Sequence, residues 1–150
     1  MYNEQFMQKA IDLAKKAYAE DEVPVGAVVV KDNKIIGSGY NKREQTKNAL
    51  MHAELIAINE ACKNLSNFRL ENCDIYVTLE PCAMCAGAIV NARIENLYFG
   101  AKDKRFGATG SKLNVLDAGL NHKVNYSGGY FESEIVTLLQ EFFNNLRKRL

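Results

Sequence analysis

Residues 74–92 read DIYVTLEPCAMCAGAIVNA, and this stretch decides how the middle of the chain folds. Its first six residues are mostly apolar, β-branched or aromatic, so they predict a strand over 74–79. Pro81 suits the first residue of a helix, which we expect to run through Ile89 to about Ala92. The stretch therefore predicts a strand followed at once by a helix, with Cys82 and Cys85 in the first turn of that helix.

The same alternation of strands and helices extends outward in both directions. Apolar residues at helical spacing predict helices over about 3–20, from near 52 to 65, and over 132–150. Runs rich in β-formers at 25–31 and 34–40 flank Asp32-Asn33, which predicts a tight hairpin, and 96–100 is a further strand. A Gly-rich loop at 107–111, a short helix over 113–118 and a weaker strand over 123–126 follow. This order predicts an α/β protein with a mixed sheet and helices on both faces.

Length and composition indicate a single soluble domain over residues 1–150. Of the 150 residues, 47% are hydrophobic and 25% are charged, which is typical of globular proteins. The longest apolar run, residues 25–30, is far shorter than the ~20 residues that a membrane helix requires. The N-terminus has neither the basic start nor the apolar core of a signal peptide. We therefore expect a cytoplasmic protein with no membrane partner.

Basic residues gather in two stretches, although the net charge is only +1. Residues 101–112 contain four basic residues and one acidic residue, and residues 42–47 contain three basic residues and one acidic residue. Either stretch can contact phosphate groups, and either can equally form a solvated face.

The four cysteines fall into two kinds. Cys82 and Cys85 are separated by two residues, a spacing typical of metal or redox sites. Cys62 and Cys73 lie in apolar segments, and we interpret them as small buried residues. A chain of this size without an export signal does not need disulfides.

The chemistry is concentrated in two segments, HAE at 52–54 and PCAMC at 81–85. Each alone is common, but together, each opening a predicted helix, they match the H-x-E…P-C-x-x-C signature of zinc deaminases. His52, Cys82 and Cys85 supply three zinc ligands, and the fourth position stays open for water, as in catalytic zinc sites. We expect Glu54 to stay off the metal, to take a proton from that water and to pass it to the ring nitrogen and the departing amine of a nucleobase.

Structural or redox interpretations of the cysteine pair are also possible. A structural zinc site needs a fourth Cys or His ligand. Cys62 and Cys73 lie within apolar segments, and His122 lies in a distant loop. The catalytic interpretation is therefore favoured.

Beyond this motif, essentially the whole chain resembles the bacterial tRNA-specific adenosine deaminases, within the superfamily of cytidine and deoxycytidylate deaminases. The resemblance rests on HAE at 52–54, TLEPCAMCAGA at 78–88, RI at 93–94, FGAKD at 99–103, GATGS at 107–111 and LNH at 120–122. It continues through Phe142-Phe143 and Leu146-Arg147. The metal motif identifies only the superfamily, whereas the segment after Phe99 and the C-terminal helix point to the enzymes that act on tRNA.

The resemblance implies a three-layer α/β/α, cytidine-deaminase-like fold with a mixed five-stranded sheet, one zinc ion per subunit and a homodimer. It implies hydrolysis of adenosine to inosine at the wobble position of a tRNA anticodon, with the anticodon stem-loop as partner and no DNA. Glu54 matches the proton shuttle of the family. Substrate contacts are implied for Asn41, the peptide N–H near Ala53, Ala101, Asp103, Lys104 and Phe143. Without the resemblance, Asn41 would be interpreted as a turn residue and Phe143 as a core residue.

Two other functions remain open at this point. A deaminase of a free base or small nucleoside, such as guanine or cytosine, would use the same zinc chemistry without a basic surface. A non-catalytic, zinc-stabilised RNA-binding subunit is disfavoured by the presence of Glu54. Residues 48–51 and Phe106 depart from the family pattern near the expected substrate entrance.

Overall fold

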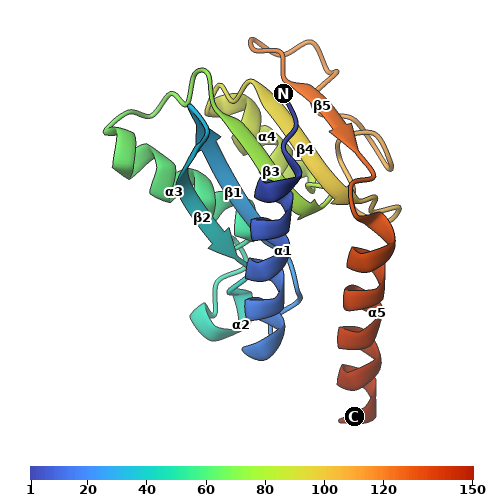
Figure 1. Ribbon diagram of the computed structural model, residues 1–150. Coiled ribbons are helices and arrows are strands. Elements are labelled where there is room, and N and C mark those ends of the chain that lie inside the picture. The colour runs from blue at the N-terminus through green and yellow to red at the C-terminus, as the bar shows by residue number, and fades with distance from the viewer.

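The computed structural model describes residues 1–150 as a mixed five-stranded sheet between two layers of helices (Figure 1). The strands are β1 (Gly26–Lys31), β2 (Lys34–Tyr40), β3 (Asp74–Leu79), β4 (Asn96–Ala101) and β5 (Asn125–Gly128). The helices are α1 (Glu4–Ala19), α2 (Arg43–Thr46), α3 (Ala53–Leu65), α4 (Ala83–Asn91) and α5 (Glu132–Lys148). The predicted α/β class with a five-stranded sheet is confirmed.

The sheet has the order β2-β1-β3-β4-β5 and combines antiparallel and parallel pairs. β1 pairs antiparallel with β2 and β3, whereas β3, β4 and β5 are parallel. Leu79 at the end of β3 pairs with Ala101 at the end of β4. The segments that follow both strands therefore leave the sheet at the same edge, where ligands usually bind in α/β sheets.

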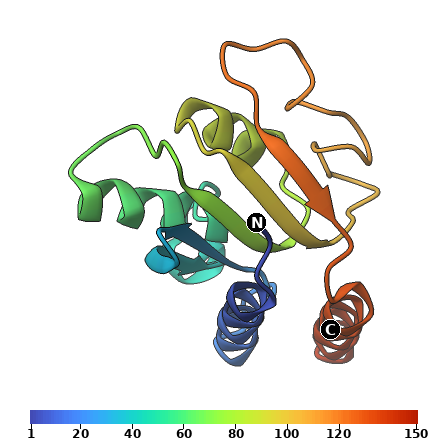
Figure 2. The ribbon, with the colours of Figure 1, turned by 45° about the horizontal axis from the view of Figure 1, so that its top comes forward.

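Alternate residues of the strands divide the core into two halves. Val28 packs with residues of α1 and with Ile135 of α5, on one face of the sheet. Its neighbour Val29 packs with Ala57 of α3 and Ile89 of α4, on the other face. Figure 2 shows α1 and α5 together below the sheet, with α3 and α4 on the opposite side. The three-layer arrangement follows from this period of two along each strand.

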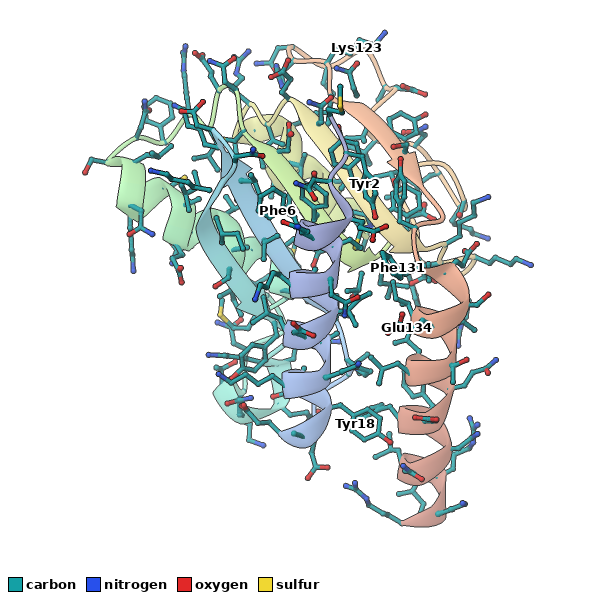
Figure 3. The ribbon with its side chains drawn as sticks, in the orientation of Figure 1. Tyr2, Phe6, Tyr18, Lys123, Phe131 and Glu134 are labelled. Carbon is teal, nitrogen blue, oxygen red and sulfur yellow. The ribbon has the colours of Figure 1, made fainter.

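Aromatic side chains join α1 and the N-terminus to α5. The rings of Tyr2 and Tyr130 stack with their centroids 3.8 Å apart. At the other end of α1, the hydroxyl of Tyr18 accepts a hydrogen bond from Asn145 Nδ2 at 2.6 Å, and its ring meets Phe142 edge-on (Figure 3). None of the helices combines the length and the hydrophobicity that crossing a lipid bilayer requires.

Two glycines let α3 lie directly against β2. A Cβ atom on Gly37 would lie 2.2 Å from the carbonyl oxygen of Ala57, and one on Gly39 would lie 2.6 Å from that of Ala53. Because Ala53 is the first residue of α3, this close approach also fixes where that helix begins on the sheet.

Four local features differ from the expectations. Pro81 lies just before the helix, because Cys82 is its N-cap and α4 begins at Ala83. Residues 113–118 form turns rather than a helix, and the predicted strand over 123–126 lies two residues later, at Asn125–Gly128. The short helix α2 was not predicted. A single turn has too few residues for a hydrophobic period to show in the sequence.

Candidate active site

The N-termini of α3 and α4 converge on one site. His52 is the N-cap of α3 and Cys82 is the N-cap of α4, and neither side chain caps its own helix. The Nδ1 atom of His52 instead lies 3.7 Å from Cys82 Sγ and 3.6 Å from Cys85 Sγ. Free backbone N–H groups and the positive end of the α4 dipole favour thiolates at these positions.

The three side chains have the spacing of ligands to one metal ion. Their ligand atoms all lie within 4.8 Å of one another, and no fourth His, Cys, Asp or Glu belongs to the group. Zn–S bonds of about 2.3 Å and Zn–N bonds of about 2.05 Å at a tetrahedral angle place nitrogen and sulfur about 3.6 Å apart. The observed separations of 3.7 and 3.6 Å match that value. The site is therefore able to bind a metal with three protein ligands.

The charges at the two sulfurs also favour a cation. The hydrogen bond from the Cys85 thiol lowers the pKa of Cys82 to about 3. The same bond, together with burial, raises the pKa of Cys85. The hydrogen bond with Cys82 raises the pKa of His52. Without a metal the site thus favours one thiolate, at Cys82, that is hydrogen-bonded to a thiol at Cys85, and a divalent metal ion would let both sulfurs bind as thiolates.

Glu54 stands in the first turn of α3 and is only 4% exposed. Burial raises the pKa of its carboxyl group to about 7. The carboxylate does not belong to the group of metal-ligand atoms. A buried carboxyl group whose pKa is raised in this way, beside a group of residues able to bind a metal, is suited to accept and return protons.

A cavity of about 830 Å³ opens over these residues. His52, Glu54 and Cys82 line it, together with residues of the loop after β4 and of α5. Its rim carries exposed cations and two exposed aromatic rings, Phe106 at 64% and Phe143 at 40% exposure. The cations are Arg43, Lys102, Lys104 and Arg105.

The predicted substrate-contact residues divide into those that line the cavity and one that does not. Asn41, Ala53, Asp103, Lys104 and Phe143 all line it. Ala101 instead lies in a smaller adjacent pocket that shares Lys102, Arg105 and Phe143 with the cavity. The structure therefore brings five of the six together around the metal-ligand group.

Asn41 and Phe143 were the two residues with competing interpretations. Asn41 Oδ1 accepts a hydrogen bond from Arg43 N at 3.1 Å, and its Nδ2 donates to Val23 O at 3.4 Å. The residue thus stabilises the turn into α2 and lines the cavity at once. The core position expected for Phe143 belongs to its neighbour Phe142, which is 6% exposed.

The other two cysteines and the second histidine lie away from the site. Cys62 and Cys73 are free thiols, and burial raises the pKa of both. The Nε2 atom of His122 lies 2.8 Å from the carbonyl oxygen of Ile94. None of the three belongs to the metal-ligand group.

Two buried glutamates were not singled out from the sequence: Glu80, which is among the residues that line the cavity, and Glu22, which is not. Glu22 is 1% exposed and accepts hydrogen bonds from Glu44 N and Gln45 N, which holds α2 in place. Glu80 is 3% exposed and binds the loop after β4. Their partners lie more than twenty residues away in the chain, so no local pattern distinguishes them from exposed glutamates.

Comparison with known proteins gives consistent relatives over the full chain. A family model described as MafB19-like deaminase matches residues 1–147. A tRNA-specific adenosine deaminase of Bacillus subtilis (strain 168) is 45% identical over 148 residues, which cover 98% of this chain and 92% of the relative. A tRNA-specific adenosine deaminase of Aquifex aeolicus (strain VF5) is 45% identical over 151 residues, which cover 100% and 99%.

Solved structures of deaminases are similar to this chain to different extents. A structure from a study of A-to-I editing by tRNA:A34 deaminases has a TM-score of 0.84 and 39% identity, covering 91% of this chain and 99% of that one. A guanine deaminase from Bacillus subtilis has a TM-score of 0.65 and 40% identity, covering 68% and 66%. A guanine deaminase from Nitrosomonas europaea has a TM-score of 0.82 at 21% identity, which shows a shared fold alone.

Proposed function

Because this chain belongs to the deaminase family whose MafB19-like model matches residues 1–147, and because its full-length relatives are tRNA-specific adenosine deaminases, we propose that it hydrolyses adenosine to inosine at the wobble position of a tRNA anticodon. One observation supports this most directly. A buried glutamate, Glu54, lies beside the group of His52, Cys82 and Cys85 at the base of a cavity with cationic and aromatic residues on its rim.

His52, Cys82 and Cys85 would hold a zinc ion, since their separations fit tetrahedral zinc ligands. Zinc bound there supplies a water molecule that is activated for attack at neutral pH. Glu54 is not needed as a ligand and is therefore free for proton transfer.

Glu54 would carry the protons of the reaction. Its carboxylate takes one proton from the attacking water and delivers it to N1 of the adenine ring as the C6–O bond forms. It takes the second proton of that water and gives it to the amino group, which leaves as ammonia when the C6–N bond breaks. Adenosine and water thus give inosine and ammonia. The N–H of Ala53, at the first position of α3, has no intrahelical acceptor and can stabilise the negative charge on the oxygen.

The rim of the cavity supports an RNA substrate over a free base. The exposed rings of Phe106 and Phe143 can stack on unpaired bases, and Lys104 and Arg105 can contact phosphates. Anticodon nucleotides are unpaired and can be turned into a pocket at modest cost. A free purine carries no phosphate and would leave these cations without a role.

The substrate can be tested by incubating the protein with an anticodon stem-loop that has adenosine at the wobble position. We expect inosine there, none when the wobble base is guanosine, and no product from free guanine or cytosine. A Glu54→Gln protein serves as the negative control in every reaction. Turnover of guanine or cytosine without inosine in the RNA would contradict the proposed function and favour a free-base deaminase.

The proposal includes a homodimer that acts on tRNA in the cytoplasm. Residues Met84, Gly87 and Ala88 leave part of α4 accessible in the single chain, which is consistent with a further contact there. Light scattering after size-exclusion chromatography should give about twice the chain mass of 16.8 kDa, as closed two-fold dimers are the commonest oligomers. A mass equal to one chain would contradict this part of the proposal.

A further inference from the structure

Glu80 is a buried carboxylate that the proton chemistry does not use. It directly follows β3 and is 3% exposed. Its Oε1 atom accepts hydrogen bonds from Asp103 N at 3.1 Å and from the hydroxyl of Ser111. Its Oε2 atom accepts from Thr109 N at 3.1 Å and from Ser111 N at 3.0 Å.

These donors saturate the carboxylate. An ionised carboxyl group has roughly four lone-pair positions, and four donors occupy them in this structure. None of the ion pairs in the molecule involves Glu80. Burial raises the pKa of Glu80, but the hydrogen bonds from Ser111, Asp103 and Thr109 outweigh it and leave the pKa below its usual value. Glu80 therefore has no free oxygen position with which to bind a substrate.

The loop that Glu80 holds forms one wall of the cavity. Residues 102–111 contain no helix or strand, yet residues 102–106 all line the cavity. Asp103 connects Glu80 to this wall through hydrogen bonds. Its N–H is bound to Glu80, and its Oδ1 atom accepts hydrogen bonds from Arg105 N at 3.0 Å and Phe106 N at 3.1 Å.

The fit between loop and carboxylate leaves no spare room. A Cβ atom on Gly107 would lie 2.4 Å from Cδ and Oε2 of Glu80 and 2.4 Å from the carbonyl oxygen of Asp103. The chain can pass over the carboxylate at this distance only because residue 107 is glycine. The loop and Glu80 are therefore built as one unit.

We propose that Glu80 is a positioning residue, which sets the place of residues 103–106 over the cavity and thereby the affinity for the RNA substrate. It acts through the loop, because its carboxylate lies outside the metal-ligand group and is saturated by loop donors. The inference rests on the proposed function, since the loop residues are assigned to RNA contacts there. Loss of Glu80 should raise KM and change kcat little.

Glu80→Gln is the sharpest test, because the amide has nearly the same shape but only one acceptor oxygen. Its NH₂ group would face N–H donors of the loop and leave at least one of them unsatisfied. We expect KM for the anticodon stem-loop to rise roughly tenfold or more, the factor typical of losing a hydrogen bond to a charged group. The value of kcat should stay within about threefold, and zinc content should be unchanged, because general acid–base catalysis by Glu54 is untouched.

Two matched variants complete the design. Glu60→Gln makes the same change at an exposed position of α3 and should leave KM and kcat unaltered. Ser111→Ala removes only the hydroxyl donor, so it should raise KM by less than Glu80→Gln does. If Glu80→Gln does not fold, the KM of Ser111→Ala tests whether the hydrogen bonds of Glu80 set the affinity for RNA. Hydrogen exchange of the amides of Asp103 and Thr109 should be faster in Glu80→Gln than in Glu60→Gln.

The outcomes separate this inference from the proposed function. An unmodified protein that does not deaminate the stem-loop would overturn the proposed function and with it the role in RNA affinity. An active unmodified protein with unaltered KM and amide exchange in Glu80→Gln would overturn the positioning role alone. A fall in kcat at constant KM would also overturn it, because the effect would then lie in the chemical step.

Discussion

The Nδ1 atom of His52 lies 3.6 Å from the Sγ atom of Cys85, although the two residues are 33 positions apart in the chain. His52 precedes α3 and Cys85 lies in the first turn of α4, so a metal ion bound to both would tie the starts of two helices together. Metal affinity and folding should therefore be coupled in this protein.

Cys85→Ala should abolish metal binding. Cys85 is fully buried, and its sulfur is one of only three ligand atoms in the group. We expect zinc by elemental analysis to fall from about one ion per chain to near zero, and the thermal unfolding midpoint to fall with it. Cys62→Ala is the matched control, since that cysteine lies outside the metal-ligand group. Full zinc occupancy in Cys85→Ala would contradict the ligand assignment.

Glu54→Gln should separate catalysis from metal binding. The substitution keeps the shape of a buried side chain but removes the group that exchanges protons. We expect kcat on the anticodon stem-loop to fall at least ~100-fold, the lower range of general acid–base contributions. Zinc content should equal that of the unmodified protein. A variant that retains both zinc and full activity would remove Glu54 from the mechanism.

Much of this arrangement could be predicted from the sequence because its signals are local. The apolar period of α1, the Asp32-Asn33 hairpin and the strand over 74–79 all appear in the structure within about one residue of the predicted bounds. The grouping of His52, Cys82 and Cys85 was also predicted, because these residues belong to a motif with fixed spacing.

The parts that were missed depend on contacts between distant residues. Residues 113–118 have an apolar pattern but fold as turns, held by Asn114 Oδ1, which accepts from Leu116 N and Asp117 N. Ala101 lies in the adjacent pocket rather than in the cavity lining because of its place at the end of β4, and its expected contact with substrate stays a prediction. The role of Glu80 depends on a loop more than twenty residues away, as its partner Asp103 shows.

Gly37→Ala should destabilise the fold through the contact between β2 and α3. The added Cβ atom would lie 2.2 Å from Ala57 O and 2.7 Å from Ala61 N, so strand and helix must move apart. We expect a loss of about 1–3 kcal/mol in the free energy of unfolding, as for other overpacked cores. Ser38→Ala, at the next residue of β2, should change it by no more than about 0.5 kcal/mol. Denaturant titration of both variants would measure the difference, and equal stabilities would contradict the close approach.

Stability should decline at alkaline pH because of two tyrosines near the start of α1, Tyr2 and Tyr76. Burial raises the pKa of Tyr2 and of Tyr76 to about 12. In the unfolded chain these groups lose their protons near pH 10, so between about pH 10 and 12 the unfolded state binds fewer protons than the folded state. The free energy of unfolding must fall as pH rises through that window and level off above it. Tyr76→Phe should flatten this slope when unfolding is measured by denaturant titration from pH 8 to 11.5. An unchanged slope would show that Tyr76 does not contribute.

Arg105→Gln should weaken RNA binding and make that binding less dependent on salt concentration. Arg105 is exposed on the rim of the cavity, forms no ion pair within the chain and packs over the ring of Phe106 at 5.3 Å. If it neutralises one phosphate, its loss makes the negative slope of log K against log salt concentration shallower by about 1. Arg69→Gln is the control, because Arg69 lies before the start of β3, whereas the cavity lies at the end of that strand. Arg69 also already pairs with Glu71, at 3.8 Å. Binding of the anticodon stem-loop across a salt series distinguishes the two variants. Equal slopes for Arg105→Gln and Arg69→Gln would show that the rim of the cavity does not contact the RNA backbone at this residue.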